Sequence, residues 1–344
     1  MKSFNVGVNG MGRIGRSLIR ESIQRASEGE DLGFKITSVN NPGDIETYMH
    51  LLKYDSVHGK LDKEITLGPD KKSFSVAGQE IQFYTQKNPS DIPWGEKNVK
   101  IVLDSTGVFK DKKGLSQHMH SGVEKVILCA PGKDVDGTFV YGINHETFDP
   151  AKHSIISNAS CTTNCLAPVA KVLNDNYGIE SGFMTTVHAY TSDQNLLDNS
   201  HGDLRRARAA AVSMIPTSTG AAKATSLVIP ELKGKLDGHA IRVPTADVSL
   251  VDLCVNLKKE VSADDVNKLM KRESEGSLKG VLAYTDEPLV AIDFTGRRES
   301  SIFDSLVTQT MGKTLKLVSW YDNEIGFSNR VLDLASYVGR KTWL

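Results

Sequence analysis

The sequence predicts an α/β protein with two unlike halves: a doubly wound parallel sheet, followed by an α+β region with a mixed or antiparallel sheet. Two observations carry this prediction. Up to about residue 160, short β-like runs alternate with helical stretches, which is typical of a parallel sheet with helices on both faces. Beyond residue 160 the β-like runs are longer, which favours a sheet with helices on one face.

The first half opens with a β-like run at 4–8, a glycine-rich turn and a helical stretch at 16–26. Leu18, Ile19 and Ile23 lie on one side of that helix. The further elements that we expect are strands at 35–39, 99–104 and 125–129 and a helix at 45–52.

The second half begins with a helix at 162–174, whose apolar residues form one stripe. Further helices are expected at 221–228, at 263–272 after the capping residue Ser262, and at 328–339. The expected strands are 183–190, 240–243, 249–257, 290–294 and 315–321. We therefore predict a dinucleotide-binding domain at 1–160, a catalytic domain at 161–327 and a C-terminal helix at 328–344 that packs back on the first domain.

Composition favours a globular enzyme. Charged residues make up 24% of the 344 residues and apolar residues 39%, and the net charge of −1 gives no reason to expect a nucleic-acid partner. No apolar run approaches the roughly 18 residues of a membrane helix, and the N-terminus has no signal-peptide pattern. The four cysteines suggest neither a disulfide framework nor a metal site. We expect a cytoplasmic protein with no membrane partner.

The segment GMGRIG follows a predicted strand and opens a helix, which is the context of a dinucleotide-binding fingerprint of the Rossmann type. Gly10 would permit the tight turn, Gly12 the approach of a pyrophosphate, and Gly15 the packing of helix on strand. The alternative is a glycine-rich turn without a ligand.

The end of the second strand bears on the choice of cofactor. An acidic residue about 20 positions after the glycines usually binds the ribose 2′-hydroxyl of NAD. Here the strand ends at Asn40 and Asn41, which are neutral, and Asp44 comes only after a turn. The sequence therefore tolerates NADP, although no arginine stands beside this position to select for it.

Cys161 lies in SNASCTTN, a stretch of small residues at the expected start of a helix, where the positive helix end would favour a thiolate. His188, in a β-like run just downstream, is the best candidate for its base; a satisfied core or surface histidine is the alternative. Cys165, one turn later, could be a resolving thiol but is more typical of inner packing. We expect Cys129 and Cys254, which lie in apolar runs, to be core residues.

Seven segments in order then resemble one family: GMGRIGR, SNASCTTNCLAP, HAYTSDQ, DLRRARAAA, PTSTGAAKA, IRVPT and WYDNEIGFSNR. Together they span nearly the whole chain, which resembles the phosphorylating glyceraldehyde-3-phosphate dehydrogenases. The resemblance implies that Cys161 attacks the aldehyde to give a thiohemiacetal and that His188 acts as its base. Hydride transfer to the nicotinamide then leaves a thioester, which inorganic phosphate cleaves to an acyl phosphate.

The resemblance also implies two anion sites. Thr191 and Arg242 would bind the phosphate of the substrate. The inorganic phosphate would be bound by Ser160, Thr162, Arg206, Thr219 and Gly220. Without the surrounding motifs, the basic run at 205–208 would be interpreted as a solvated or salt-bridged face.

The cofactor residues that the resemblance implies are Gly10, Gly12, Arg13, Ile14, Gly15, Asn41, Ser105, Thr106, Gly107, Cys129, Ser200 and Asn323, with Tyr321 nearby. Asn41 stands where NAD-specific members commonly have aspartate, and Asn199-Ser200 where they commonly have Leu-Pro. Both departures favour NADP, so we predict that NADP is used at least comparably to NAD. Cys129 stands where the family often has serine or threonine near the cofactor, so the chain departs from the family at one polar cofactor contact.

The family is tetrameric, so a homotetramer is expected, in which Ser200 acts across an interface. Erythrose-4-phosphate dehydrogenase is the alternative activity; the threonine of HAYTSDQ and the complete second anion site favour the triose phosphate. A protein that uses the fold only to bind nucleotides or RNA would be expected to lack Cys161 or His188, and both are present.

Overall fold

The computed structural model describes residues 3–344 as two compact units. The first unit comprises residues 3–141, 145–159 and 328–344, and the second comprises residues 142–144 and 160–327. The predicted fold class is confirmed, since each unit contains a sheet of the expected kind.

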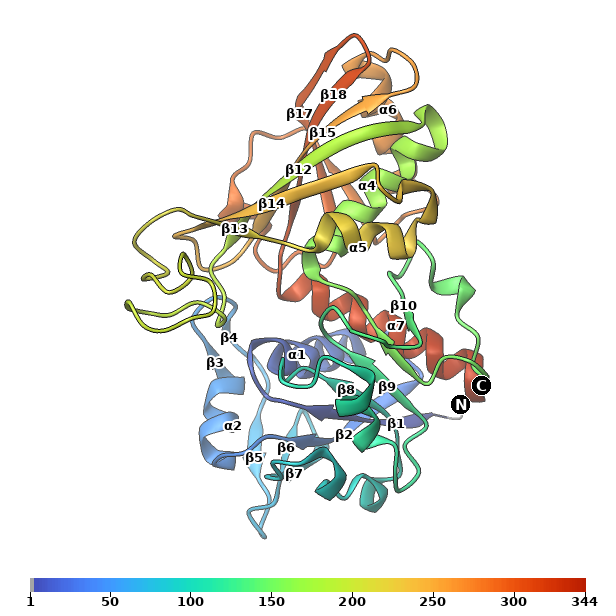
Figure 1. The fold of residues 1–344 in the computed structure, drawn as a ribbon. Coiled ribbons are helices and arrows are strands. Elements are labelled where there is room, and N and C mark those ends of the chain that lie inside the picture. Colours follow the sequence, from blue (N-terminus) through green and yellow to red (C-terminus); the bar gives the residue numbers. More distant parts are fainter. Residues whose placement is uncertain (1–2) are drawn as a thin grey trace. The chain divides into compact units, whose positions relative to one another are not determined.

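A nine-stranded sheet with the order β10-β11-β9-β8-β1-β2-β7-β6-β5 forms the centre of the first unit. Its strands from β10 to β7 pair in parallel, whereas β7, β6 and β5 pair antiparallel. In Figure 1, α1 lies over the strands near β1. The strands are β1 (Phe4–Asn9), β2 (Phe34–Asn40), β5 (Ile65–Leu67), β6 (Ser73–Val76), β7 (Gln79–Tyr84), β8 (Val99–Asp104), β9 (Lys125–Leu128), β10 (Gly137–Thr138) and β11 (Ile155–Ser157).

Helices α1 and α3 lie between consecutive parallel strands of this sheet, whereas α7 comes after the last strand of the chain. A small hairpin of β3 (Tyr54–Asp55) and β4 (Gly59–Lys60) stands apart from the main sheet. The helices are α1 (Arg13–Ser27), α2 (Ile45–Lys53), α3 (Lys112–Leu115), the greater part of α7 (Ile325–Trp343), and the short 3₁₀ turns η1 (Pro89–Asp91), η2 (Trp94–Lys97), η3 (Ser116–His118) and η4 (His145–Thr147).

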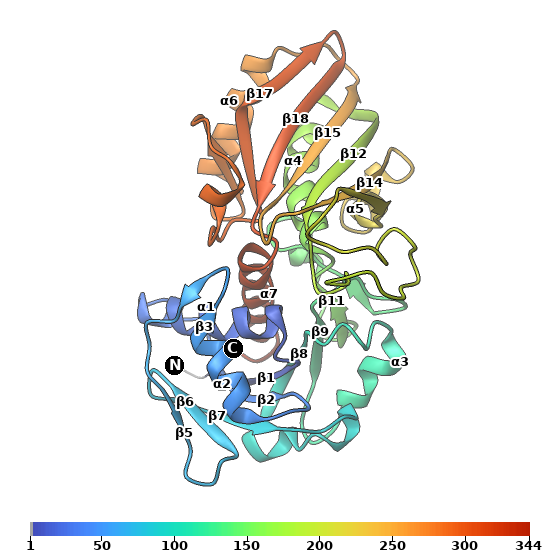
Figure 2. The ribbon, with the colours of Figure 1, turned by 90° about the vertical axis from the view of Figure 1, so that its left-hand side faces the viewer.

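A seven-stranded mixed sheet with the order β13-β14-β12-β15-β18-β17-β16 forms the second unit. Helices α4 and α6 pack against its strands and against each other (Figure 2). The strands are β12 (Ile179–Ala189), β13 (Ile215–Ser218), β14 (Leu236–Val243), β15 (Ser249–Leu257), β16 (Leu282–Thr285), β17 (Ser301–Met311) and β18 (Thr314–Tyr321). The helices are α4 (Cys161–Tyr177), α5 (Ala221–Val228), α6 (Ala263–Glu275) and the 3₁₀ turns η5 (Pro230–Leu232) and η6 (Ala291–Phe294).

Two sequence predictions in this unit are wrong. The segment 290–294 is not a strand: the Asp293 carboxylate accepts the Val290 N–H at 2.9 Å, and Ala291–Phe294 form a 3₁₀ turn with Phe294 buried. Cys254 is exposed and not a core residue, because burial along β15 alternates and Cys254 falls on the uncovered face. Cys165 is fully buried, as expected for packing.

Within residues 3–344, no helix is both long enough and apolar enough to cross a membrane.

Candidate active site

Cys161 is the first residue of α4, a helix of 17 residues. Ser160 caps this helix, because its Oγ accepts the N–H of Thr163 at 3.0 Å. No acidic residue lies in the first turn, so the positive end of the helix is not neutralised locally. Helix α4 therefore presents the sulfur at its N-terminal end, as the sequence predicts.

His188 lies near the end of β12 and brings its ring to that sulfur: Cys161 Sγ and His188 Nε2 are 3.5 Å apart. Strand β12 pairs in parallel with β14, and this register sets His188 beside Arg242. The structure thus unites the two predicted catalytic side chains, which are 27 positions apart in the chain.

The tautomer of His188 is determined by the hydrogen bond of its Nδ1. Nδ1 lies 2.7 Å from the carbonyl oxygen of Ala189, which can only accept, so Nδ1 carries the hydrogen. Arg242 Nη1, 3.2 Å from the same Nδ1, donates instead to the Ala189 oxygen at 2.9 Å. Nε2 therefore keeps its lone pair directed at the thiol, which is the arrangement that a base for Cys161 needs.

The local environment keeps both groups neutral. Crowding of the sulfur by protein raises the pKa of the Cys161 thiol, although the Arg242 charge and hydrogen bonds from Thr162 act to lower it. Burial, together with the positive charge of Arg242, lowers the pKa of His188 to about 3. The shift of the thiol pKa is therefore opposite to the expected one, because desolvation outweighs the Arg242 charge and the hydrogen bonds to the sulfur.

Thr191 and Arg242, the pair predicted to bind the substrate phosphate, lie together, with Nη1 of Arg242 donating to Thr191 Oγ1 at 3.2 Å. Within residues 3–344 the buried Nε of Arg242 has no hydrogen-bond partner. A guanidinium presents its donors as a fork, so the Nε edge remains available to an anion. The structure thus fits a phosphate beside the Cys161–His188 pair.

Arg206, predicted for the inorganic phosphate, is held at the start of α5. Its Nη2 donates to the carbonyl of Ser218 at 2.9 Å, directly before Thr219 and Gly220, and its Nε donates to Thr217 Oγ1 at 2.9 Å. Asp193 pairs with Nη1 of the same guanidinium at 2.6 Å. The basic residue is therefore partly salt-bridged, as the alternative interpretation held, and an anion there would compete with Asp193.

Thr162 makes a contact that the sequence did not indicate. Its hydroxyl lies 2.8 Å from that of Tyr321, which in turn lies 2.9 Å from Thr186 Oγ1. The Tyr321 ring also meets the His188 ring edge-on, with 5.9 Å between the centroids. Tyr321 thus ties α4 to β12 beneath the reactive pair, and the Thr162 hydroxyl faces this buried tyrosine.

Asn323, one of the predicted cofactor residues, is held in place by Ser249. Ser249 Oγ donates to Asn323 Oδ1 at 2.7 Å and accepts the N–H of Ala189 at 3.0 Å. The residue before Ser249, Val248, is buried at φ +65°, a strained conformation for a β-branched side chain. Asn323 is therefore linked to the strand that carries His188.

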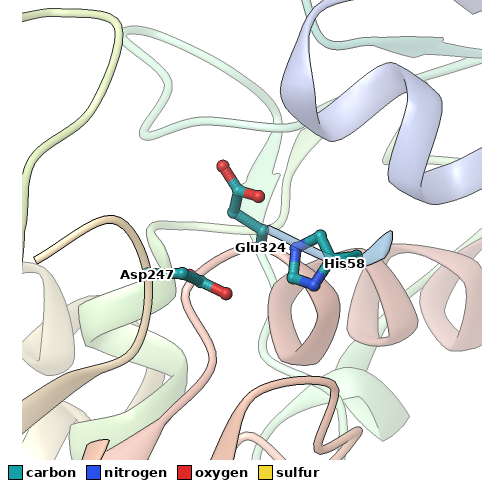
Figure 3. Close-up of side chains that lie close together, drawn as sticks. All are labelled: His58, Asp247 and Glu324. Carbon is teal, nitrogen blue, oxygen red and sulfur yellow. The ribbon is translucent and has the colours of Figure 1, made fainter. Parts of the chain in front are cut away.

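A buried carboxyl group precedes this strained residue. Figure 3 shows the side chains of Asp247, from the loop before β15, and of Glu324, from the segment before α7. Burial and the negative charges of Asp322 and Glu324 raise the pKa of Asp247 to about 9. Asp322 is itself an acceptor for the N–H groups of Glu324, Ile325 and Gly296. Asp247 is consequently protonated at neutral pH.

The glycine loop of the first unit has the shape of a dinucleotide site. Gly10 has φ +96°, and a Cβ there would lie 2.9 Å from the backbone nitrogen of Thr106. A Cβ at Gly15 would lie 1.9 Å from the Gly10 oxygen, whereas one at Gly12 would meet nothing within 4 Å. The open space at Gly12 adjoins the start of α1, which has no acidic residue in its first turn, so these residues fit a pyrophosphate.

The other predicted cofactor residues of this unit lie around the loop. Asn41 Oδ1 accepts the Met11 N–H at 2.8 Å, and Arg13, which with Ile14 begins α1, pairs with Asp55 at 2.6 Å. Ser105 Oγ donates to the carbonyl oxygen of Gly10 at 2.8 Å. Cys129 follows β9 and is half-buried, so it is not the core residue that was expected, although protein around the sulfur raises the pKa of its thiol. Ser200 lies in the other unit, on an exposed loop.

Sequence reasoning missed Asp193, the bridging role of Tyr321, and Asp247. Asp193 and Tyr321 lie within segments that were singled out, and Asp247 lies two residues after one. Their roles depend on partners far along the chain, so no local pattern could have indicated them.

Comparisons with known proteins show the family of the chain. Residues 4–112 match the glyceraldehyde 3-phosphate dehydrogenase NAD binding domain, and residues 160–323 match the C-terminal domain of the same family. The chain is 52% identical over 337 residues to glyceraldehyde-3-phosphate dehydrogenase 1 of Bacillus cereus, covering 98% of both chains. It is also 52% identical over 340 residues to the enzyme of Geobacillus stearothermophilus, covering 98% of this chain and 99% of that one. The chain therefore belongs to the glyceraldehyde-3-phosphate dehydrogenase family.

Proposed function

We propose that this protein oxidises D-glyceraldehyde 3-phosphate to 1,3-bisphosphoglycerate with NAD(P)⁺ and inorganic phosphate. The observation that carries the proposal is the 3.5 Å contact between Cys161 Sγ and His188 Nε2, beside the free edge of Arg242. A thiol with a base and an adjacent anion site suits covalent catalysis on a phosphorylated aldehyde.

The neutral pair acts through a proton that His188 holds in turn. As Sγ bonds to the aldehyde carbon, the thiol proton passes to Nε2 and then to the former carbonyl oxygen, which gives a thiohemiacetal. Bound NAD(P)⁺ supplies the acceptor for the hydride that leaves the same carbon. His188 takes the hydroxyl proton as the thioester forms. When an oxygen of hydrogen phosphate attacks the thioester carbon, the C–S bond breaks, the sulfur regains that proton from His188, and the phosphate releases its own proton to solvent.

Anion binding divides between two groups of residues. Arg242 and Thr191 bind the substrate phosphate, which places the aldehyde carbon near Sγ. Arg206, Thr219, Gly220, Ser160 and Thr162 bind the attacking phosphate, for which the first turn of α5 supplies backbone N–H groups. For Thr162 we assign the backbone rather than the hydroxyl, because the hydroxyl contacts Tyr321.

A direct test measures NAD(P)H formation with and without phosphate, on wild type and on Cys161→Ser. The variant should lose at least about 10³-fold in kcat, as expected when a covalent nucleophile is removed. Turnover that persists in the variant would contradict the covalent route. Oxidation that proceeds unchanged without phosphate would favour erythrose-4-phosphate dehydrogenase activity instead.

Use of both cofactors is the finer part of the proposal. Asn41 carries no charge that would repel a 2′-phosphate, and its oxygen is engaged with Met11 N. The hydroxyl of Ser200 lies on an exposed loop and could donate to that phosphate. The kcat/KM values for NAD and NADP should therefore lie within about 100-fold of each other. A larger preference for NAD would defeat this part alone.

We also propose a cytoplasmic homotetramer. Large apolar side chains are exposed along the 190–214 loop and on strands of the second unit: Leu196, Leu197, Leu204, Val212 and Met214 in the loop, and Phe183, Leu306 and Met311 on strands. Exposed apolar surface of this extent is typical of subunit interfaces. Light scattering behind a sizing column should give four times the 37.6 kDa chain mass; a monomer would contradict it.

A further inference from the structure

A buried polar network crosses the carboxyl ends of three neighbouring strands in the first unit. Asn9, Asn40 and Asp104 are the last residues of β1, β2 and β8, and Asn9 is in register with each of the other two. Asn40 Nδ2 donates to Asn9 Oδ1 at 2.8 Å, and Asn9 Nδ2 donates to Asp104 Oδ2 at 2.9 Å. Each of the three directly precedes a residue assigned to the cofactor site: Gly10, Asn41 and Ser105.

Asp104 is the acceptor at the centre of this network. Its Oδ2 also accepts from His118 Nε2 at 3.1 Å, and its Oδ1 accepts the N–H and the hydroxyl of Thr106 at 3.1 and 2.7 Å. Both Asp104 and His118 are completely buried. A buried carboxylate that loses a hydrogen-bond donor is destabilised, because no water replaces that donor. Each hydrogen bond to Asp104 therefore constrains the positions of the groups that make the others.

The protonation of His118 is set by Trp94. The indole N–H can only donate, and it lies 3.2 Å from His118 Nδ1, so Nδ1 must be the acceptor. The hydrogen of a neutral His118 therefore sits on Nε2 and is donated to Asp104. Because His118 is hydrogen-bonded on both sides in this tautomer, the position of the buried Trp94 constrains the position of the Asp104 carboxylate.

The network ends on the turn that follows β8. Thr106 is held by Asp104, and Ser105 Oγ donates to the carbonyl oxygens of Asn9 and Gly10 at 3.1 and 2.8 Å. The backbone of Thr106 in turn packs where a Cβ on Gly10 would lie. The placement of the glycine loop thus depends on Asp104.

We propose that His118 is a positioning residue for the dinucleotide site: through Asp104 it fixes the 105–107 turn against Gly10 and so determines the affinity for the cofactor. This inference rests on the proposed function in that the glycine loop must bind a dinucleotide. The hydrogen-bond partners of His118 belong to the first unit, whereas Cys161 and His188 belong to the second, so we expect its loss to act on cofactor binding and not on the reactivity of Cys161.

Two amide substitutions separate positioning from simple stability. His118→Gln can place an N–H donor near the position of Nε2 and keep the bond to Asp104. His118→Asn can place an acceptor near Nδ1 and keep the bond to Trp94, but it loses the donor to Asp104. Leu115→Ala, in the same apolar cluster as Trp94, is the matched control for lost packing.

The measurements are the Kd for NAD⁺ by calorimetry, the Tm, and the rate of Cys161 alkylation by iodoacetamide. We expect His118→Asn to raise the Kd at least about 10-fold while His118→Gln and Leu115→Ala stay within about threefold, all with an unchanged alkylation rate. Thr106→Val, which removes the hydroxyl donor from a partly exposed site, should raise the Kd in the same way if His118→Asn does not fold.

Two results would overturn the inference. One is an equal Kd for the Asn and Gln variants. The other is a Kd that follows Tm across all variants, Leu115→Ala included. A wild-type protein that binds no dinucleotide at all would instead contradict the proposed function, so the two failures are distinguishable.

Discussion

Each unit contains a buried histidine, His118 in the first and His188 in the second. The two differ in whether the second ring nitrogen has a fixed hydrogen-bond partner. Both nitrogens of His118 lie within 3.2 Å of fixed partners, Trp94 and Asp104. Only one nitrogen of His188 is held in this way: Nδ1 lies within 3.2 Å of the Ala189 carbonyl and of Arg242 Nη1, while Nε2 lies 3.5 Å from the Cys161 sulfur. A histidine with both nitrogens committed can only hold its neighbours in place. A histidine with one nitrogen directed at a thiol can take up and return a proton.

The largest effect should come from removing the proton acceptor in the second unit. In His188→Asn the amide can keep the donor to the Ala189 oxygen but supplies no base at Nε2. We expect kcat to fall by about 10²–10⁴-fold, the usual contribution of a positioned general base, with Tm nearly unchanged. A fall in kcat of less than about 10-fold would place His188 with His118 among the positioning residues.

Arg242 tests the anion site next to that base. Arg242→Gln keeps a donor for the Ala189 oxygen but loses the charge and the free Nε edge. The KM for glyceraldehyde 3-phosphate should rise about 30- to 150-fold, in keeping with about 2–3 kcal/mol for charged hydrogen bonds. Unphosphorylated glyceraldehyde is the control substrate, and an equal loss on both substrates would contradict the assignment.

The same comparison can be made between two buried acids, one in each unit. Asp247 is protonated, whereas the carboxylate of Asp104 accepts hydrogen bonds from four donors. Because the pKa of Asp247 is raised in the folded state to about 9, folding is favoured most below the pKa of the unfolded chain. That stability is lost as the pH rises toward 9. Asp247→Asn, an isostere of the protonated acid, should therefore raise the Tm by about 3–6 °C at pH 8 and by much less at pH 5.

Thermal scans of wild type and Asp247→Asn between pH 5 and pH 9 measure this dependence. Asp286→Asn, at an exposed carboxyl group in the same unit, is the control and should leave the Tm nearly constant. A gain for Asp247→Asn that is the same at every pH would mean that Asp247 is not a titrating group.

The smallest effect concerns the glycine loop. Gly12→Ala adds a methyl group to open space, so the fold should be unaffected, while the Kd for NAD⁺ should rise about 10-fold because the methyl occupies the approach of the pyrophosphate. Gly15→Ala is the opposite control, since its Cβ would collide with the Gly10 oxygen and destabilise the unit. Unchanged binding by Gly12→Ala would leave this loop without a ligand role.

Several elements could be predicted from local sequence alone. Alternation and capping residues placed β15 at Ser249–Leu257 and α5 at Ala221–Val228 without error, and Ser262 caps α6 as expected, accepting the Asp265 N–H at 3.1 Å. Strand β17 was missed because its 11 residues mix serine, aspartate and threonine with apolar side chains and show no clear run. The uncovered face of β15 could not be foreseen for Cys254, because a period of two does not tell which face a helix will cover.

The site divides in the same way. The sequence by itself determined which residues carry chemistry: a thiol at a helix start, a histidine on a strand, and glycines where a backbone must approach a ligand. Only the tertiary structure decided how those groups behave. The parallel register of β12 and β14 set Arg242 beside His188, and burial, which depends on every surrounding segment, made both the thiol and the imidazole neutral. Reactive geometry and desolvation are sums over contacts distant in the chain, and no local pattern encodes them.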